Sequence, residues 1–238
     1  MRIDILTLFP NFFSSPFSIS LLSKAIRKKI VAIFLHDIRD FGTGKHKSVD
    51  DRPFGGGPGM VLKPDVLSKS LESVIGTASK AGLRSRPWVI LLDPAGTHLT
   101  QGKVEQLSKK SWLILICGHY EGVDERFKKN FINEEISIGD YVLSGGEAAA
   151  LVLTEAVSRL LPGFLGKIES SQLESFSKVS FAGKELTLLD YPVYTRPENF
   201  QGHPVPKILL SGNHSKIEKW HFEKALEKTK KRRPDLLK

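Results

Sequence analysis

Short apolar runs separated by polar turns recur along the first half of the chain. Two of them, Trp88–Leu92 and Trp112–Cys117, are apolar at every position. Continuous apolar runs of this length are typical of strands that are buried on both faces of a parallel sheet. Ile3–Phe9 and Ile30–Leu35 are two further candidate strands.

Helical spacing appears between and after these runs. Apolar residues recur at three- and four-residue intervals in two segments, Ile19, Leu22, Ile26 and Ile30 in the first and Leu153, Val157 and Leu160 in the second. In the second segment Glu155 and Arg159 also form an i,i+4 pair. Strands that alternate with helices predict an α/β domain built on a parallel sheet.

The pattern changes after Leu161. The segment Pro162–Glu185 holds five serines and three glycines, and no hydrophobic period runs through it. A segment this long without a pattern is usually functional or disordered. We therefore predict a first domain over 1–161, a flexible linker over 162–185 and a small basic domain over 186–238.

One helix is predicted in the last domain. Ser215 and Glu218 have the spacing of a capping box, and an apolar pattern follows them. Pro234 should end this helix at or near Arg233.

Composition narrows the class of protein. Of the 238 residues 40% are hydrophobic and 26% are charged, as in an ordinary globular protein with a real core. A single cysteine, Cys117, excludes an intramolecular disulfide and a CxxC metal site, and we interpret it as a core residue. The sequence has no apolar run of the roughly 18 residues that a membrane span needs, and no signal-peptide pattern. We expect a cytoplasmic protein without membrane partners.

The net charge of +9 favours a polyanionic partner such as nucleic acid. From Lys216 to Lys238 nine Lys and Arg face four Asp and Glu, so more than half of the surplus lies in the last tenth of the chain. The alternative is that this segment is simply a solvated tail.

Three polar, glycine-containing loops adjoin the candidate elements: Asp93–Gly96 and Gly118–Gly122 each follow a strand, and Ile138–Glu147 precedes a helix. Parallel strands end at one edge of a sheet, where ligands bind. Any one loop could be an ordinary turn, but three together favour a ligand pocket. The G-x-G-x-x-G, P-loop and H-E-x-x-H patterns do not occur there.

The stretch Asp50–Met60 is unlike a helix or a strand because three consecutive glycines and a Pro-Gly pair interrupt it. Two carboxylates and an arginine stand at its start. By its residues alone it is a rigid binding loop of unspecified ligand.

Six segments resemble the bacterial tRNA (guanine-N1)-methyltransferases (TrmD) of the SPOUT class. Together they run from the first residues into the basic C-terminal segment without large insertions. They are Leu8–Pro10, Val49–Met60, Cys117–Arg126, Ser137–Glu147, Tyr194–Glu198 and Leu210–His214.

The resemblance implies a deep trefoil knot in the first domain, a mainly helical C-terminal domain that binds tRNA, and a homodimer. It implies methyl transfer from S-adenosylmethionine to N1 of guanosine 37 in tRNA, just 3′ of the anticodon. Mg²⁺ is a further expectation from the family, although no ligand cluster is visible in the sequence. The implied cofactor-binding residues are Leu92, Pro94, Gly118, Tyr120, Ile138, Gly139, Tyr141, Leu143, Gly145 and Gly146.

Four residues resemble catalytic positions of the family: Asp50, Glu121, Arg159 and Glu174. N1 of neutral guanine carries a proton, so a carboxylate must remove it while a guanidinium stabilises the charge that develops on O6. The implied roles are contact with the target guanosine for Asp50, a requirement for activity for Glu121, contact with the guanine for Arg159, and the general base for Glu174.

The chain departs from the family pattern at three positions. The family's base is typically an aspartate followed by Ser-Phe, and here Glu174 precedes Ser175 and Phe176. The extra methylene moves the carboxylate by roughly 1 Å, a shift that can cost catalysis heavily. A solvent-facing Glu174, with Glu169 as the base, is the alternative. His119 stands where many relatives have arginine and Ala149 where some have proline.

Two other functions remain open at this stage. One is a knotted RNA methyltransferase with another target base, which Asp50, Arg159 and the segment 211–214 argue against. The other is a non-catalytic RNA-binding protein that has lost its base, which the change at Glu174 allows.

Overall fold

A computed structural model describes residues 1–165, 174–181 and 184–237. The chain divides into two units, Met1–Gly166 and Lys167–Lys238. Each unit is described by itself.

The first unit is built on a five-stranded parallel sheet in the order β2-β1-β6-β5-β7. Its strands are β1 (Arg2–Thr7), β2 (Ala32–Asp37), β5 (Trp88–His98), β6 (Trp112–Cys117) and β7 (Glu134–Ser137). Its helices are α1 (Ser14–Ser18), α2 (Ser20–Arg27), α3 (Pro64–Lys80), α4 (Gln101–Ser108), α5 (Glu125–Phe131) and α6 (Glu147–Arg159), with 3-10 turns at Pro10–Phe13 and Ile38–Phe41. The short strands β3 (Asp50–Asp51) and β4 (Val61–Leu62) form a separate antiparallel pair.

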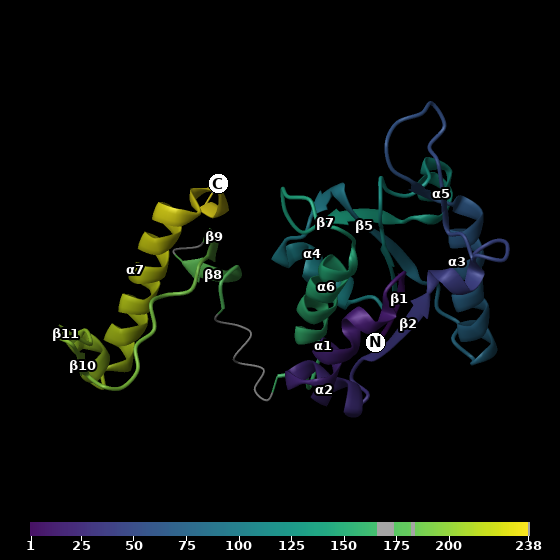
Figure 1. The fold of residues 1–238 in the computed structure, drawn as a ribbon. Helices are drawn as coiled ribbons and strands as arrows, with labels where there is room; N and C mark the ends of the chain where they lie inside the picture. Colours follow the sequence, from purple (N-terminus) through teal and green to yellow (C-terminus); the bar gives the residue numbers. More distant parts are fainter. Residues whose placement is uncertain (166–173, 182–183, 238) are drawn as a thin grey trace. The chain divides into compact units, whose positions relative to one another are not determined.

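Both faces of the sheet are covered, because successive strand residues point to opposite faces. Leu113, Leu115 and Cys117 belong to a core that includes residues of α2, α4 and α6. Trp112, Ile114 and Ile116 belong to a second core that includes residues of α3 and α5. Figure 1 shows α4 and α6 on one side of the sheet and α3 and α5 on the other.

The four predicted strands are confirmed, and three of them have ends within two residues of the prediction. Strand β5 instead continues six residues past Leu92 to His98, so Asp93–Gly96 lies within the strand and does not follow it. Strand β7 was missed because Glu134 and Glu135 interrupt any apolar run. The first predicted helix is wrong at its end: α2 stops at Arg27 instead of reaching Ile30, because Lys29 adopts a left-handed backbone with φ of 58°. The predicted parallel α/β class is confirmed.

The second unit contains a hairpin of β8 (Ser177–Phe181) and β9 (Lys184–Leu188), a short pair β10 (Asn199–Phe200) and β11 (His203–Pro204), and helix α7 (His214–Arg232). 3-10 turns lie at Lys207–Leu210 and Pro234–Leu237. The chain at Leu189 and Asp190 is tied to α7, because the Leu189 N–H donates to Thr229 Oγ1 at 2.9 Å and Lys228 Nζ donates to the Asp190 carbonyl at 2.8 Å.

Two local expectations for this unit are wrong. The cap of α7 is Asn213, whose Oδ1 accepts from the Lys216 N–H at 3.1 Å, and Ser215 lies inside the helix. The expectation of an irregular segment over 162–185 fails where β8 and β9 lie, because these strands pair with each other from Ser177 to Leu188. The end of α7 before Pro234 is confirmed.

Candidate functional site

A cavity of about 330 Å³ lies at the carboxyl ends of β6 and β7 and at an irregular segment of β5, the strand between them. Three segments form most of its wall: 92–95 in β5, 118–122 after β6, and 136–146 from the end of β7 to the start of α6, and Ala149 in the first turn of α6 also lines it. The expectation of one pocket at one edge of a parallel sheet is thus met. The wall contains all ten residues expected to bind the cofactor: Leu92, Pro94, Gly118, Tyr120, Ile138, Gly139, Tyr141, Leu143, Gly145 and Gly146.

Backbone contacts join the second wall segment, 118–122, to the third, 136–146. The Gly146 N–H donates to the Gly118 carbonyl at 2.9 Å, and His119 pairs with Gly145 in an antiparallel bridge. A Cβ atom on Gly146 would lie 2.7 Å from Cys117 Cα and 3.0 Å from Gly118 N. Glycine is therefore required at 146 for the start of α6 to approach the end of β6 this closely.

A buried polar network lies beside these backbone contacts. Thr7 Oγ1 donates to Glu147 Oε1 at 2.6 Å, and His119 Nε2 lies 2.7 Å from Glu147 Oε2. Glu147 is the first residue of α6, where the helix dipole favours a carboxylate. The Phe9 N–H donates to Thr7 Oγ1 at 2.9 Å, so the network ties the end of β1 to the cavity wall.

Cys117 is completely buried at the end of β6. Burial, reinforced by the charge of Glu147, raises the pKa of its thiol well above the ordinary value. This environment confirms the interpretation of Cys117 as a core residue and disfavours a nucleophilic thiolate.

Glu121 lies on the cavity wall, next to the stretch Asp50–Met60, which we call the glycine-rich loop. Its N–H donates to the Met60 carbonyl at 2.9 Å, and a Cβ on Gly59 would lie 2.3 Å from Glu121 Oε1. The loop therefore packs directly against this carboxylate.

The same loop carries Asp50. Strand β3 holds Asp50 opposite Leu62 of β4, and the Leu62 N–H donates to the Gly122 carbonyl at 3.0 Å. The Asp50 hairpin is thus hydrogen-bonded to the segment that carries Glu121. At the tip of the loop Phe54 is 97% exposed and Gly55, Gly56 and Gly57 have positive φ, so an aromatic face is open to a ligand.

Arg159 lies at the other end of α6 from the cavity. Ala149 in the first turn of α6 is on the cavity wall, and the ten residues from it to Arg159, at 1.5 Å per residue, place Arg159 Cα about 15 Å further along the helix. An arginine side chain cannot span that distance. The structure thus brings Glu121 and the Asp50 hairpin together but does not bring Arg159 of the same chain to them.

Glu174 belongs to the second unit, just before β8. It lines a mostly apolar pocket of about 280 Å³ there, together with residues of β8, β9 and α7 such as Val179, Leu188 and Phe222. Glu169, the alternative base, lies outside the described residues.

No group of three or more potential metal ligands occurs within residues 1–165, 174–181 and 184–237, so the expectation of Mg²⁺ has no support. Over the same ranges no helix combines the length and apolar character that crossing a membrane requires. The last turn of α7 carries Lys230, Lys231 and Arg232, and the charge surplus seen in the sequence therefore lies on this helix.

Several wall residues were missed by the sequence interpretation: Asp93, Ala95, Ser137, Val142 and Ser144. They belong to, or directly adjoin, the three predicted loops. Assigning every residue of each loop and its immediate neighbours to the wall would have found them. The His119–Glu147–Thr7 network had no sequence signal, because Thr7 and Glu147 are 140 residues apart.

Comparison with known proteins shows similarity over the whole chain. Residues 1–238 match the family described as tRNA (Guanine-1)-methyltransferase TrmD. A protein of Geobacillus kaustophilus named tRNA (guanine-N(1)-)-methyltransferase is 52% identical over 237 residues, which cover 100% of this chain and 91% of the relative. Proteins of the same name from Dictyoglomus turgidum and Moorella thermoacetica are 50% and 47% identical, each over 100% of this chain and 90% of the relative.

Proposed function

This chain belongs to the tRNA (guanine-1)-methyltransferase family, TrmD, and is a tRNA methyltransferase, and we propose that it methylates N1 of guanosine 37 with S-adenosylmethionine as donor. The observation that carries the proposal is the convergence of all ten expected cofactor residues on one cavity, with Glu121 on the same wall.

The cavity has the properties that an S-adenosyl group requires. It combines apolar side chains such as Leu92 and Ile138 with glycine backbone, which brings N–H and C=O groups close to a ligand. We assign the ten residues named above to cofactor binding. When bound, S-adenosylmethionine supplies an electrophilic methyl group, so the remaining task of the protein is to position and deprotonate the guanine.

The guanine is assigned to the side of the cavity where Glu121 and the glycine-rich loop meet. Asp50 and Glu121 have carboxylates that can accept hydrogen bonds from the N1–H and amino groups of guanine. Exposed Phe54 offers a stacking face for a neighbouring base. Glu174 is assigned as the general base and Arg159 as the cation that stabilises negative charge on O6.

A homodimer is supported by two observations. Arg159 lies about 15 Å along α6 from Ala149 on the cavity wall of its own chain, so a second copy would supply the arginine. Exposed apolar side chains also gather on mutually contacting elements at the start of the first unit and on α6, namely Phe9, Phe12, Ile19, Leu21 and Val152. Light scattering should give twice the chain mass of 26.5 kDa, and a monomer at assay concentrations would refute the dimer.

We also propose that the first unit is knotted, as in the SPOUT class, by the wall segments that pass one another between β6 and α6. The close approach of His119 to Gly145 and of Gly146 to Gly118 is consistent with such a crossing. An experimental chain trace tests this point. The second unit is assigned to tRNA binding through α7, and the protein to the cytoplasm, where its tRNA substrate is found.

The role of Glu174 can be tested by single-turnover methyl transfer with the parent, Glu174→Gln and Glu174→Asp. We expect the Gln variant to lose at least about a hundredfold in rate, within the usual range for a general base, with unchanged binding of the cofactor. The Asp variant should retain activity. A fully active Gln variant would refute Glu174 as the base and leave Asp50 or Glu169 as candidates.

A further inference from the structure

The β5 segment of the cavity wall is an interruption of the sheet. Leu92 pairs with Ile136 of β7, and Thr97 then pairs with the same Ile136, so the four residues Asp93–Gly96 have no partners in the β5–β7 ladder. Asp93, Pro94 and Ala95 of this bulge line the cavity. The position of the wall here depends on contacts other than the ladder.

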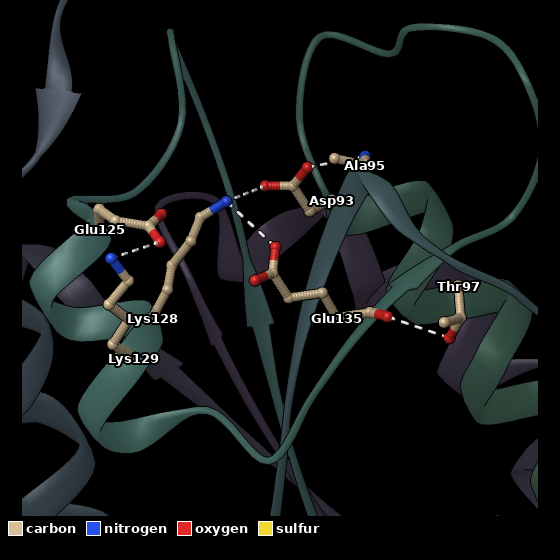
Figure 2. Close-up of polar contacts among 7 residues, drawn as sticks. All are labelled: Asp93, Ala95, Thr97, Glu125, Lys128, Lys129 and Glu135. Carbon is tan, nitrogen blue, oxygen red and sulfur yellow. Dashed lines mark hydrogen bonds and ion pairs between the residues drawn. The ribbon is translucent and has the colours of Figure 1, made fainter.

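Lys128 of α5 makes those contacts. Its Nζ donates to Asp93 Oδ2 at 2.8 Å and to Glu135 Oε2 at 3.1 Å, which joins the bulge to β7 across the break in the ladder (Figure 2). The other carboxylate oxygen, Asp93 Oδ1, accepts from the Ala95 N–H at 2.9 Å. Glu135 is also held through its backbone, because Thr97 Oγ1 donates to its carbonyl at 3.2 Å.

The burial of these groups makes the contacts stronger than ordinary surface ion pairs. The side chains of Lys128 and Asp93 are only 15% and 16% exposed. Burial alone would raise the pKa of Asp93, but the hydrogen bonds from Lys128 and Ala95 outweigh it and hold the pKa below its usual value. Asp93 therefore stays charged, with both carboxylate oxygens engaged inside the protein.

The neighbouring Lys129 provides a contrast. It points to a different partner, Glu125, at 3.6 Å, and both side chains are more than 60% exposed. Pairs of this kind contribute little to stability. The two adjacent lysines of α5 thus differ in burial and in whether they contact the bulge.

We propose that Lys128, which is not on the cavity wall, is a positioning residue that fixes the Asp93–Ala95 wall and thereby sets the affinity for the S-adenosyl cofactor. The inference rests on the proposed cofactor. The role of Asp93 is to hold the wall in place, because both of its carboxylate oxygens accept hydrogen bonds within the protein, from Lys128 and from the Ala95 N–H.

The test compares Lys128→Met, Lys128→Arg and Lys129→Met in the full chain. Titration calorimetry with S-adenosylmethionine gives the Kd, and hydrogen exchange of the free protein reports the Ala95 amide. We expect Lys128→Met to weaken cofactor binding roughly tenfold, the size of one lost charge-assisted hydrogen bond, and to accelerate exchange at Ala95. Lys128→Arg should restore most of the affinity, and Lys129→Met should match the parent.

Steady-state kinetics separate positioning from general damage. A positioning role predicts a higher KM for the cofactor with the KM for tRNA and kcat within about twofold of the parent. Unchanged Kd and unchanged Ala95 exchange in Lys128→Met would overturn the inference. Equal losses in all parameters, with lowered unfolding temperature, would also overturn it in favour of a purely structural role. A parent protein that binds no S-adenosylmethionine would instead refute the proposed function itself.

Discussion

Substitution of Gly146 by alanine should damage the cavity through a single methyl group. Gly146 has φ of −79° and ψ of −4°, which alanine adopts without strain, so the effect would be steric only. The new Cβ would lie 2.7 Å from Cys117 Cα, about 0.7 Å inside the 3.4 Å at which ordinary contact begins. All three nearest atoms belong to the backbone of Cys117 and Gly118 and cannot rotate away.

The free-energy cost of Gly146→Ala can be estimated from these contacts. Overpacking of a well-packed site costs about 1–3 kcal/mol, and loss of the Gly146 N–H bond to Gly118 adds about 1 kcal/mol. Displacement of α6 from β6 moves two of the three wall segments apart. If half of this free-energy cost weakens cofactor binding, the Kd for S-adenosylmethionine should rise about tenfold.

Gly76→Ala is the matched control. Gly76 lies inside α3, and a Cβ there would meet no atom within 4 Å. Alanine should stabilise this helix by about 0.5–1 kcal/mol and leave the cofactor Kd unchanged. Calorimetry and urea unfolding of both variants check the prediction. Parent-like affinity in Gly146→Ala would refute the view that close backbone packing shapes the cavity.

Three further predictions follow from other parts of the molecule. Hydrogen bonds from Arg2, His36 and Trp112 to buried Asp4 outweigh its burial and hold its pKa below the ordinary 3.8. The stabilisation from Asp4 is therefore complete above pH 4 and is lost as the pH falls through the lower folded-state pKa. Asp4→Asn should lower the free energy of unfolding by about 3 kcal/mol at pH 7 and reduce the loss of stability at acid pH. An unchanged loss of stability at acid pH would argue against this network. Cys117 should resist thiol reagents at pH 8 in the folded protein and react fully in denaturant, and rapid labelling of the folded form would contradict its burial. Affinity for tRNA should fall roughly tenfold or more between 50 and 200 mM salt if α7 contacts phosphates, and a flat response would mean that the net charge of +9 is incidental.

The central sheet was predictable because its strands are apolar on both faces. Continuous runs such as Trp112–Cys117 leave little choice of structure, and their position fixes where the following loops meet. Strand β7 was not predictable in this way, since its two glutamates are accommodated by tertiary contacts such as that of Lys128 with Glu135. The start of α7 was misplaced because Asn213, a residue type that caps helices as well as serine does, precedes Ser215 by two residues and is the cap.

The candidate site was predictable at the level of loops and less so at the level of networks. The three loops could be located because parallel strands end at one edge. The pairings of Lys128 with Asp93 and of Glu147 with Thr7 join residues 35 and 140 positions apart, so no local pattern contains them. The proposed role of Glu174 rests on the resemblance at Glu174–Phe176, because spacing along the chain does not by itself bring this side chain to the cavity.

The most direct test of the proposed function is transfer of labelled methyl from S-adenosylmethionine to a tRNA with guanosine at position 37, with the modified nucleoside identified by mass spectrometry. The matched control is the same tRNA with adenosine at that position. The proposed function predicts 1-methylguanosine at position 37 in the first tRNA and no product in the second. Methylation at another base would instead favour a knotted methyltransferase with a different target. Binding of cofactor and tRNA without any methyl transfer would contradict catalysis and favour an RNA-binding protein.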